Sequence, residues 1–290
     1  MNIRKAERKH SKIKMALQGP SGSGKTYSSL LLGFGLVGDY SKICIIDSEA
    51  GSADLYAHLG EFAIIQISKP YTPESYISAL ELAEKEGFKC IIIDSLSHCW
   101  QYLIDYHAGM VGNSFTNWAK ITPRHNQLIN NILSSPIHII ATLRVKQEYV
   151  LQDKGTGKLV PEKVGLKSIQ RDGVDYEFTL VFDLDIHHFA SCSKDRTGIF
   201  MDKELFIISE NTGKQIADWC TMGVSVETVK SLIQQAPDLQ QLTEIYKNYP
   251  GYFSVLEEDF LLQKAKIMST VLNNSKNIQN GTNAHPITTH

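Results

Sequence analysis

The sequence predicts an α/β protein in which a mostly parallel sheet is flanked by helices and is followed by a small helical unit. Between residues 12 and 221, short β-rich apolar runs alternate with segments of helical periodicity, a pattern typical of helices packed on both faces of a parallel sheet. The run Cys90-Ile91-Ile92-Ile93 is apolar throughout, as expected for a strand buried on both sides. After residue 221 only helical patterns follow. We therefore expect one large domain and a smaller appendage.

Five apolar segments are predicted to be strands, and helical patterns lie between them. The strands are expected at residues 13–18, 42–47, 63–67, 90–94 and 137–143. An apolar helix is expected around residues 27–36. Pro73 begins another helix whose apolar residues share one face, and Gly87 ends it. A further helix is predicted around residues 120–133.

The C-terminal part of the chain has a different pattern. It predicts three helices, at residues 225–235, 238–249 and 255–272. Pro237 and the Pro250-Gly251 pair separate them, so we expect a helical unit over residues 222–272. Residues 273–290 are polar, rich in Asn and Thr, and predicted to be a disordered tail. Residues 1–11 are predicted to form a basic N-terminal arm.

The composition limits the classes of function. The 290 residues carry a formal net charge of −2, so any binding of nucleic acid must come from local basic clusters. The five cysteines lack the paired spacing of a metal site, and we expect neither zinc nor disulfides. No apolar run is long enough for a membrane span, and the N-terminus lacks the apolar segment of a secretory signal. We therefore expect a soluble cytoplasmic protein.

A glycine-rich motif follows the first predicted strand. Gly19, Gly24, Lys25 and Thr26 fill the pattern G-x-x-x-x-G-K-[ST], in which backbone N–H groups and a helix N-terminus bind phosphate oxygens. Lys25 is expected to reach the β- and γ-phosphates of ATP, and Thr26 is expected to bind Mg²⁺. The residues predicted to hold the nucleotide are Gly19, Pro20, Ser21, Gly22, Ser23, Gly24, Lys25, Thr26 and Tyr27. Kinases and motors use the same loop; the N-K-x-D motif usual in GTPases does not occur in this sequence.

Acidic residues follow two of the predicted strands. Asp47 and Glu49 come at the end of strand 42–47, and Asp94 ends strand 90–94. The carboxyl ends of parallel strands form the ligand-binding edge of an open α/β sheet. Asp94 is therefore expected to support Mg²⁺, and Glu49 is expected to orient and deprotonate the attacking water. The alternative is that these residues only form turns.

The order of a P-loop, a strand followed by Asp-x-Glu and a strand ending in Asp-Ser resembles the RecA/RadA recombinase ATPases over residues 13–200. The segments IKMALQGPSGSGKTYSSL and NSFTNWAKITPRHNQLI, with the helical appendage, look like the phage-type AAA nucleotide-binding proteins. Some of these are RecA-like single-strand annealing proteins of the Sak group. The resemblance implies a RecA-like P-loop NTPase core over residues 12–221 that binds ATP and Mg²⁺. It also implies that Glu49 is the catalytic base and that Asp94 is the Walker-B residue.

The resemblance assigns roles to the strand at residues 137–143 and to the segment after it. Thr142 occupies the place of a polar residue that senses the γ-phosphate and relays this to a DNA-binding loop. The next segment is basic and interrupted by glycines, so we expect a mobile loop or hairpin. Its basic residues would neutralise the phosphates of single-stranded DNA without reading sequence; the alternative is a solvated charged surface. The expected DNA contacts are Arg144, Lys146, Lys154, Lys158, Lys163 and Lys167.

A second basic pair lies in the segment SCSKDRTGIF, residues 191–200. It resembles the K-x-R-x-G segment of RadA-type and replicative-helicase ATPases, in which the basic groups reach the γ-phosphate of a neighbouring subunit. Such a group stabilises transition-state charge, as an arginine finger does. The resemblance implies that Lys194 and Arg196 act in trans and that activity requires a homo-oligomer. The alternative is an ordinary charged hairpin.

These expectations combine into an ATPase that acts on single-stranded DNA in phage-type recombination or annealing, within the cytoplasm of a bacterial host. A single-strand-binding protein is a candidate partner, and no membrane is expected to be involved. Three other functions remain open at this point. A hexameric helicase or translocase would separate strands directionally, and a small-molecule phosphotransferase would need an acceptor and ignore DNA. A nucleotide-gated binding module would show negligible turnover.

Overall fold

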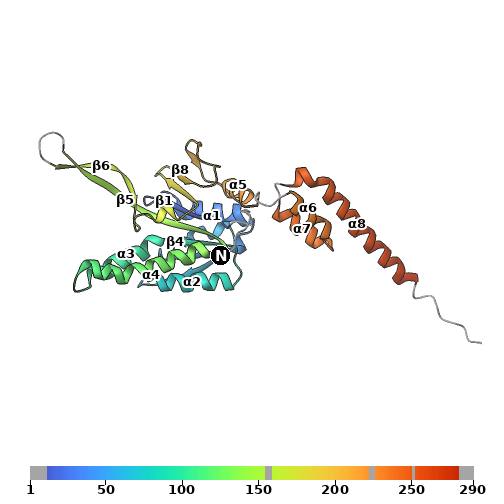
Figure 1. Ribbon diagram of the computed structural model, residues 1–290, viewed down its shortest axis with the longest axis horizontal. Helices are drawn as coiled ribbons and strands as arrows, with labels where there is room; N and C mark the ends of the chain where they lie inside the picture. Colours follow the sequence, from blue (N-terminus) through green and yellow to red (C-terminus); the bar gives the residue numbers. More distant parts are fainter. Residues whose placement is uncertain (1–11, 154–158, 222–225, 250–251, 281–290) are drawn as a thin grey trace, which may run out of the picture. The chain divides into compact units, whose positions relative to one another are not determined.

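The computed structural model describes residues 12–153, 159–221, 226–249 and 252–280 (Figure 1). The chain divides into two compact units, one formed by Lys12–Ala217 and the other containing the residues from Asp218 onward. Each unit has its own hydrophobic core. Within the described parts of the chain, no helix is both long enough and apolar enough to cross a membrane.

The larger unit contains a sheet of nine strands, most of them parallel. The strands are β1 (Lys14–Gly19), β2 (Ile43–Asp47), β3 (Ala63–Gln66), β4 (Cys90–Asp94), β5 (His138–Asp153), β6 (Leu159–Ser168), β7 (Leu180–Leu184), β8 (Phe189–Asp195) and β9 (Phe206–Ile207). Their order is β3-β2-β4-β5-β1-β7-β8-β9, and β6 pairs with β5. The strands β3, β2, β4, β5, β1 and β7 are mutually parallel, whereas β6, β8 and β9 are antiparallel to their neighbours. The predicted α/β class is confirmed.

Helices cover both faces of this sheet. They are α1 (Lys25–Val37), α2 (Pro73–Lys85), α3 (Leu96–Ala108), α4 (Ser114–Ser134) and α5 (Glu210–Thr221), with short 3₁₀ helices η1 (Tyr40–Lys42), η2 (Ser52–Leu59) and η3 (Val174–Tyr176). The helices α2, α3 and α4 lie together on one side (Figure 1), where they share a core with strand residues such as Ile91 and Ile93. Gly33 of α1 packs against Ile43 and Cys90, which point to the opposite face because side chains alternate along a strand. The fully apolar strands are thus explained by burial on both sides.

Several predicted elements end at other residues in the structure. The strand predicted at 137–143 continues to Asp153 and forms a hairpin with β6, which extends away from the sheet in Figure 1. The helix predicted at 120–133 begins at Ser114 and includes Pro123. Pro123 is the tenth residue of this helix, so the backbone hydrogen bond to the carbonyl oxygen of Ala119 is lost. Burial of the apolar face of α4, including Ile121 and Leu128, offsets that loss.

The smaller unit consists of α6 (Val226–Gln235), α7 (Leu239–Asn248) and α8 (Phe253–Asn280). Their apolar faces form a core that includes Val229, Ile233 and Phe260. Helix α8 extends beyond the predicted end at residue 272, into the segment predicted as disordered, because adding a residue to an existing helix is easier than starting one. Residues 281–290 lie outside the described part of the chain.

The packing of α1 on α5 predicts a sensitive position for stability. Backbone approaches backbone here: a Cβ added at Gly35 would overlap the carbonyl oxygen of Glu210 and lie 2.7 Å from the Cα of Gly213. We expect Gly35→Ala to lower the free energy of unfolding by about 1–3 kcal/mol, because neither helix backbone can move aside locally. Urea denaturation followed by circular dichroism measures this loss.

The matched control for this prediction is Gly33→Ala in the same helix. A Cβ there would meet the flexible end of Ile43, at 3.1 Å, and the Sγ of Cys90 at an ordinary contact distance of 3.5 Å. We expect a change within about 1 kcal/mol, since alanine also favours the helix. Equal effects of the two substitutions would contradict the close helix contact.

Candidate nucleotide and catalytic site

The predicted phosphate loop joins the carboxyl end of β1 to the first turn of α1. Gly22 and Gly24 have φ angles of 78° and 81°, in the left-handed region that favours glycine. A Cβ at Gly19 would lie 2.6 Å from the carbonyl oxygen of Leu184 and from the Oγ of Ser23. The three glycines are therefore required by the geometry of the loop. The loop places the free N–H groups of α1 at the edge of the sheet, where they can bind an anion.

Lys25 is folded back over this loop. Its Nζ donates hydrogen bonds to the carbonyl oxygens of Gly19 at 3.0 Å and Pro20 at 2.8 Å. Burial lowers the pKa of Lys25, and the nearby carboxylates of Asp94 and Glu49 oppose that shift only in part. A bound phosphate would offset the effect of burial on this pKa, because its negative charge stabilises the ammonium more than the two carbonyl oxygens do.

Asp94 connects the phosphate loop to β5. Thr26 Oγ1 donates to Asp94 Oδ2 at 2.6 Å, and Thr142 Oγ1 donates to Asp94 Oδ1 at 2.5 Å. The Asp94 side chain is nearly inaccessible, and burial raises its pKa despite the two hydroxyl donors. The structure thus brings together the two predicted Mg²⁺ ligands and the predicted γ-phosphate sensor. It does so because β1, β4 and β5 are neighbours and end at the same edge.

Glu49 lies on a loop that Asp47 holds in place. The Asp47 carboxylate accepts hydrogen bonds from the backbone N–H groups of Glu49 at 2.5 Å and Gly51 at 2.9 Å. Arg144 Nε donates to Glu49 Oε1 at 2.9 Å, and its Nη2 donates to Oε2, so that the ion pair is bidentate. Burial by itself raises the pKa of Glu49. The ion pair with Arg144 and the nearby His98 lower it by more than burial raises it, so the net pKa is below the usual value. Glu49 is therefore ionised and held by Arg144 in this state.

Two polar residues that the sequence analysis did not select complete this part of the site. Ser48 Oγ lies 2.9 Å from His98 Nδ1 and accepts a hydrogen bond from the backbone N–H of Ser95 at 3.0 Å. His98 Nε2 lies 3.8 Å from Glu49 Oε1. Burial lowers the pKa of His98, so its imidazole is neutral at pH 7. Their positions in the sequence could have indicated them: Ser48 follows Asp47 directly, and His98 comes one helical turn after Asp94.

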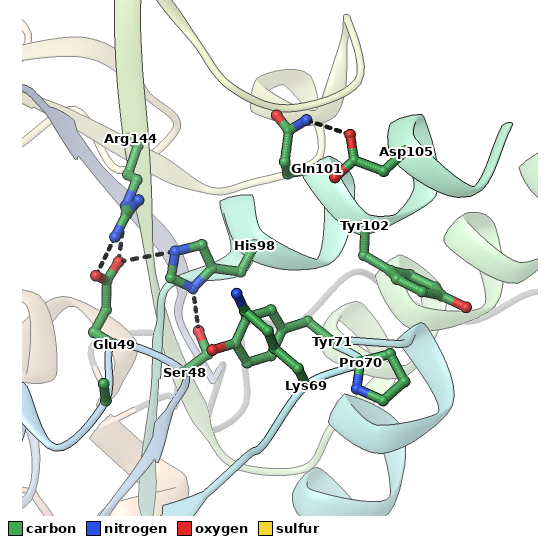
Figure 2. A pocket seen from close by; sticks show the side chains of 11 residues that line it. Ser48, Glu49, Lys69, Pro70, Tyr71, His98, Gln101, Tyr102, Asp105 and Arg144 are labelled. Atoms are coloured by element: carbon green, nitrogen blue, oxygen red, sulfur yellow. Dashed lines mark hydrogen bonds and ion pairs between the residues drawn. The ribbon is translucent and has the colours of Figure 1, made fainter. Parts of the chain in front are cut away.

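A pocket of about 740 Å³ opens beside the Glu49–Arg144 pair. Figure 2 shows it surrounded by Glu49 and Arg144 on one side, Lys69 to Tyr71 on another, and the side chains of α3 on the remaining sides. The ring of Tyr71 stacks on His98, with centroids 5.0 Å apart. The pocket therefore continues from the candidate catalytic base into a cavity lined by aromatic and charged side chains.

The residues at the phosphate loop fit ATP·Mg²⁺. The Oγ of Ser23 is buried and has no hydrogen-bond partner among the described residues, as expected of a polar group that a ligand would satisfy. The glycines leave room for phosphate oxygens, and Lys25 supplies the charge. Thr26 and Asp94 offer oxygen atoms of the kind Mg²⁺ prefers, with water and phosphate oxygens completing its shell. When bound, the metal neutralises charge that develops on the phosphates.

Comparison with known proteins agrees with this geometry. Residues 11–228 match the AAA domain family. The chain belongs to that family. This AAA domain is thereby a nucleotide-binding, nucleotide-hydrolysing ATPase. No curated protein matches the sequence.

The predicted trans-acting residues of the AAA domain lie away from its own phosphate loop. Lys194 pairs in register with Val181, near the start of β7, whereas the loop contacts the end of that strand at Leu184. Lys194 Nζ donates to the carbonyl oxygens of Asp175, at 3.0 Å, and Tyr176. Arg196 Nη2 donates to Tyr176 at 2.9 Å. Neither residue reaches the nucleotide site of its own chain.

The predicted DNA contacts of the AAA domain are divided by the structure. Arg144 is at the nucleotide site, in the ion pair with Glu49. Lys146 is exposed on β5 directly opposite Lys167 of β6, which forms an ion pair with Asp172 at 2.8 Å. Lys163 falls on β6, but its side chain is not among those described, and Lys154 and Lys158 lie outside the described residues.

The remaining predicted residue, Tyr27, is on the first turn of α1. The residue is 40% exposed, and its ring tilts against that of Tyr56 of η2, with centroids 5.7 Å apart. The turn between β7 and β8 also approaches this region: His188 Nδ1 lies 3.1 Å from the position of a Cβ on Gly24. These aromatic and imidazole groups border the phosphate loop on the outside.

Proposed function

We propose that this AAA domain hydrolyses ATP with Mg²⁺ in response to single-stranded DNA, in recombination or annealing of the phage type. The observation that carries the proposal is the continuity of β5. This strand runs from His138 to Asp153 without a break. It carries Thr142, which is bonded to Asp94, and Arg144, which is bonded to Glu49, and then enters the basic hairpin. A ligand on the hairpin can therefore shift the residues that contact the catalytic groups.

The proposed roles follow from the contacts. Lys25 and Thr26 hold the phosphates and the metal, and Asp94 supports the metal from β4. Glu49 orients and deprotonates the attacking water after its ion pair with Arg144 opens. Lys194 and Arg196 serve the nucleotide of an adjacent subunit, which their distance along the sheet from their own phosphate loop favours. The active form is then a homo-oligomer in the cytoplasm of a bacterial host, with a single-strand-binding protein as a candidate partner.

The test is ATP hydrolysis by the purified chain with and without single-stranded DNA, at low and at moderate salt. We expect DNA to raise turnover, and we expect the stimulation to fall as salt rises, because phosphate contacts release counterions. The double variant Lys146→Gln, Lys167→Gln should weaken the stimulation and its salt dependence while basal turnover remains.

The matched control is Lys85→Gln, which removes an exposed lysine at the end of α2. It should leave DNA stimulation unchanged. Turnover that does not respond to DNA at either salt concentration would contradict the DNA part of the proposal. Directional strand separation driven by ATP would instead favour a helicase or translocase.

The pocket beside Glu49 favours a second candidate, a small-molecule phosphotransferase. Its volume of about 740 Å³ is within the range of small-molecule sites, and an acceptor there would lie next to the candidate base. Such an enzyme would consume ATP only with its acceptor and would ignore DNA. The same assay separates this candidate from the DNA-stimulated ATPase.

A further inference from the structure

We propose that the pocket beside Glu49 binds one nucleotide unit, with its phosphate near Lys69 and its base against the aromatic wall and α3. We assign this nucleotide unit to single-stranded DNA, an assignment that rests on the proposed function. A free nucleoside monophosphate has the same chemistry and is the alternative source. The site is separate from the phosphate loop, whose residues do not line the pocket.

The pocket is shaped by one face of α3. His98, Gln101, Tyr102 and Asp105 are spaced at i, i+3, i+4 and i+7, which places them on the same side of a helix. The chain between β3 and α2 supplies the facing wall, with Lys69, Pro70 and Tyr71. Figure 2 shows Gln101 and Asp105 across the pocket from this segment.

The charges divide the pocket into two ends. Arg144 is neutralised by Glu49, but Lys69 forms no ion pair with any residue that the structure describes. Lys69 is exposed, so it can accept a phosphate without the cost of burying an unpaired charge. At the other end, Gln101 Nε2 donates to Asp105 Oδ1 at 2.9 Å. This pair presents a carboxylate acceptor beside an amide, which are the groups that recognise the polar edge of a base.

The remaining wall suits a flat ring. The stacked Tyr71 and His98 rings and the half-buried ring of Tyr102 line the pocket, and aromatic side chains bind unpaired bases by stacking. Asp105 can accept a hydrogen bond from an exocyclic amino group, as carboxylates do with cytosine. A cytosine nucleotide therefore matches both ends of the pocket.

Binding here would couple to hydrolysis. Lys69 and the Glu49–Arg144 ion pair line the same pocket, so an occupant of the pocket shares it with the guanidinium that holds the base. A phosphate competes with the Glu49 carboxylate for Arg144, because both are bidentate partners for guanidinium. Occupation of the pocket would then free Glu49 to act on water.

The test uses the full chain with Mg²⁺ and a non-hydrolysable ATP analogue. Fluorescence anisotropy compares a labelled oligo-dC with an abasic oligonucleotide of equal length and charge. We expect the oligo-dC to bind about tenfold more tightly, from the stacking of one base. Tyr71→Leu and, separately, Gln101→Ala should each reduce this preference while salt-dependent binding of the abasic strand remains. Gln101 is exposed, so its removal should not affect folding.

A matched control is Tyr106→Leu, which alters an exposed tyrosine of α3 that does not line the pocket; it should keep the preference. Two measurements test the free-nucleotide source. The first is displacement of the labelled oligo-dC by dCMP. The second is chromatography for dCDP after ATP is added to the chain with dCMP. Displacement by dCMP that depends on Tyr71, without a preference for oligo-dC, would keep the pocket assignment and overturn the DNA source. Equal binding of both strands in all variants and no competition by dCMP would overturn the proposal, even if DNA still stimulated hydrolysis.

Discussion

Replacement of Lys25 by alanine is expected to reduce ATP hydrolysis by about 10²–10³-fold or more, since removal of one such stabilising donor has an effect of this size. Lys25 is the cation folded over the phosphate loop, with its Nζ 2.8 Å from the Pro20 carbonyl oxygen. Among the described residues, no other cationic side chain is seen to form a hydrogen bond with this loop. The measurement is phosphate release, with nucleotide binding followed separately by titration.

The fold should survive this substitution. The two hydrogen bonds of Lys25 end on backbone carbonyl oxygens of its own loop, and burial already lowers the pKa of its ammonium. Circular dichroism and the urea midpoint should therefore remain close to those of the parent. The variant Lys42→Ala, at an exposed lysine after α1, is the matched control and should hydrolyse ATP normally. Turnover by Lys25→Ala equal to that of the parent would refute the assignment of the nucleotide site.

The parts of the fold that the sequence predicted well are those in which burial leaves a continuous pattern. Strand β4 was predicted at its observed bounds because all of its residues but the last are apolar and Asp94 ends it. Helix α2 was predicted from Pro73 because proline favours the first turn and the next apolar residues recur on one face. Gly19, Asp94 and Thr142 lie at one edge of the sheet because the carboxyl ends of parallel strands lie at the same edge. This part of the site could therefore be predicted once the strands were predicted to be parallel.

The hairpin was harder to predict. Its glycines and charged residues break the apolar alternation that indicates a strand, so the segment after residue 143 was predicted only as a mobile loop or hairpin, without strand bounds. In the structure, cross-strand pairing with β6 extends β5 to Asp153. Side-chain pattern carries no information about such pairing.

The ion pair between Glu49 and Arg144 also could not be predicted. The two residues are 95 positions apart in the chain, and their contact depends on the register of β4 with β5, which places Ile93 opposite Ala141. A shift of one residue would turn Arg144 to the other face of the sheet. The basic segment after residue 143 led us to predict Arg144 as a DNA contact. The structure places its guanidinium at the candidate base.

Substitution of Glu49 by glutamine is expected to lower ATP turnover by about 10²–10⁴-fold while nucleotide binding persists, because only the general base is removed. Glutamine has nearly the same shape and can still accept a hydrogen bond from Arg144. The Thr26–Asp94–Thr142 contacts do not involve Glu49, so the metal and phosphate groups should stay in place. Titration with ATP and Mg²⁺ checks binding, and phosphate release under saturating ATP checks turnover.

The pKa of Glu49 gives this prediction a second measurement. In the present state Arg144 keeps that pKa below its usual value, which makes the carboxylate a weak base. Without the guanidinium, burial would raise the pKa toward the pH at which a general base is most effective. Turnover that requires free Glu49 should therefore fall with decreasing pH through this raised pKa, and the residual turnover of Glu49→Gln should lack that acid limb. Turnover of Glu49→Gln equal to that of an active parent would contradict the role of Glu49 as general base and would leave the ion pair with Arg144 only a role in holding the loop. Negligible turnover of both chains would instead point to a nucleotide-gated binding module.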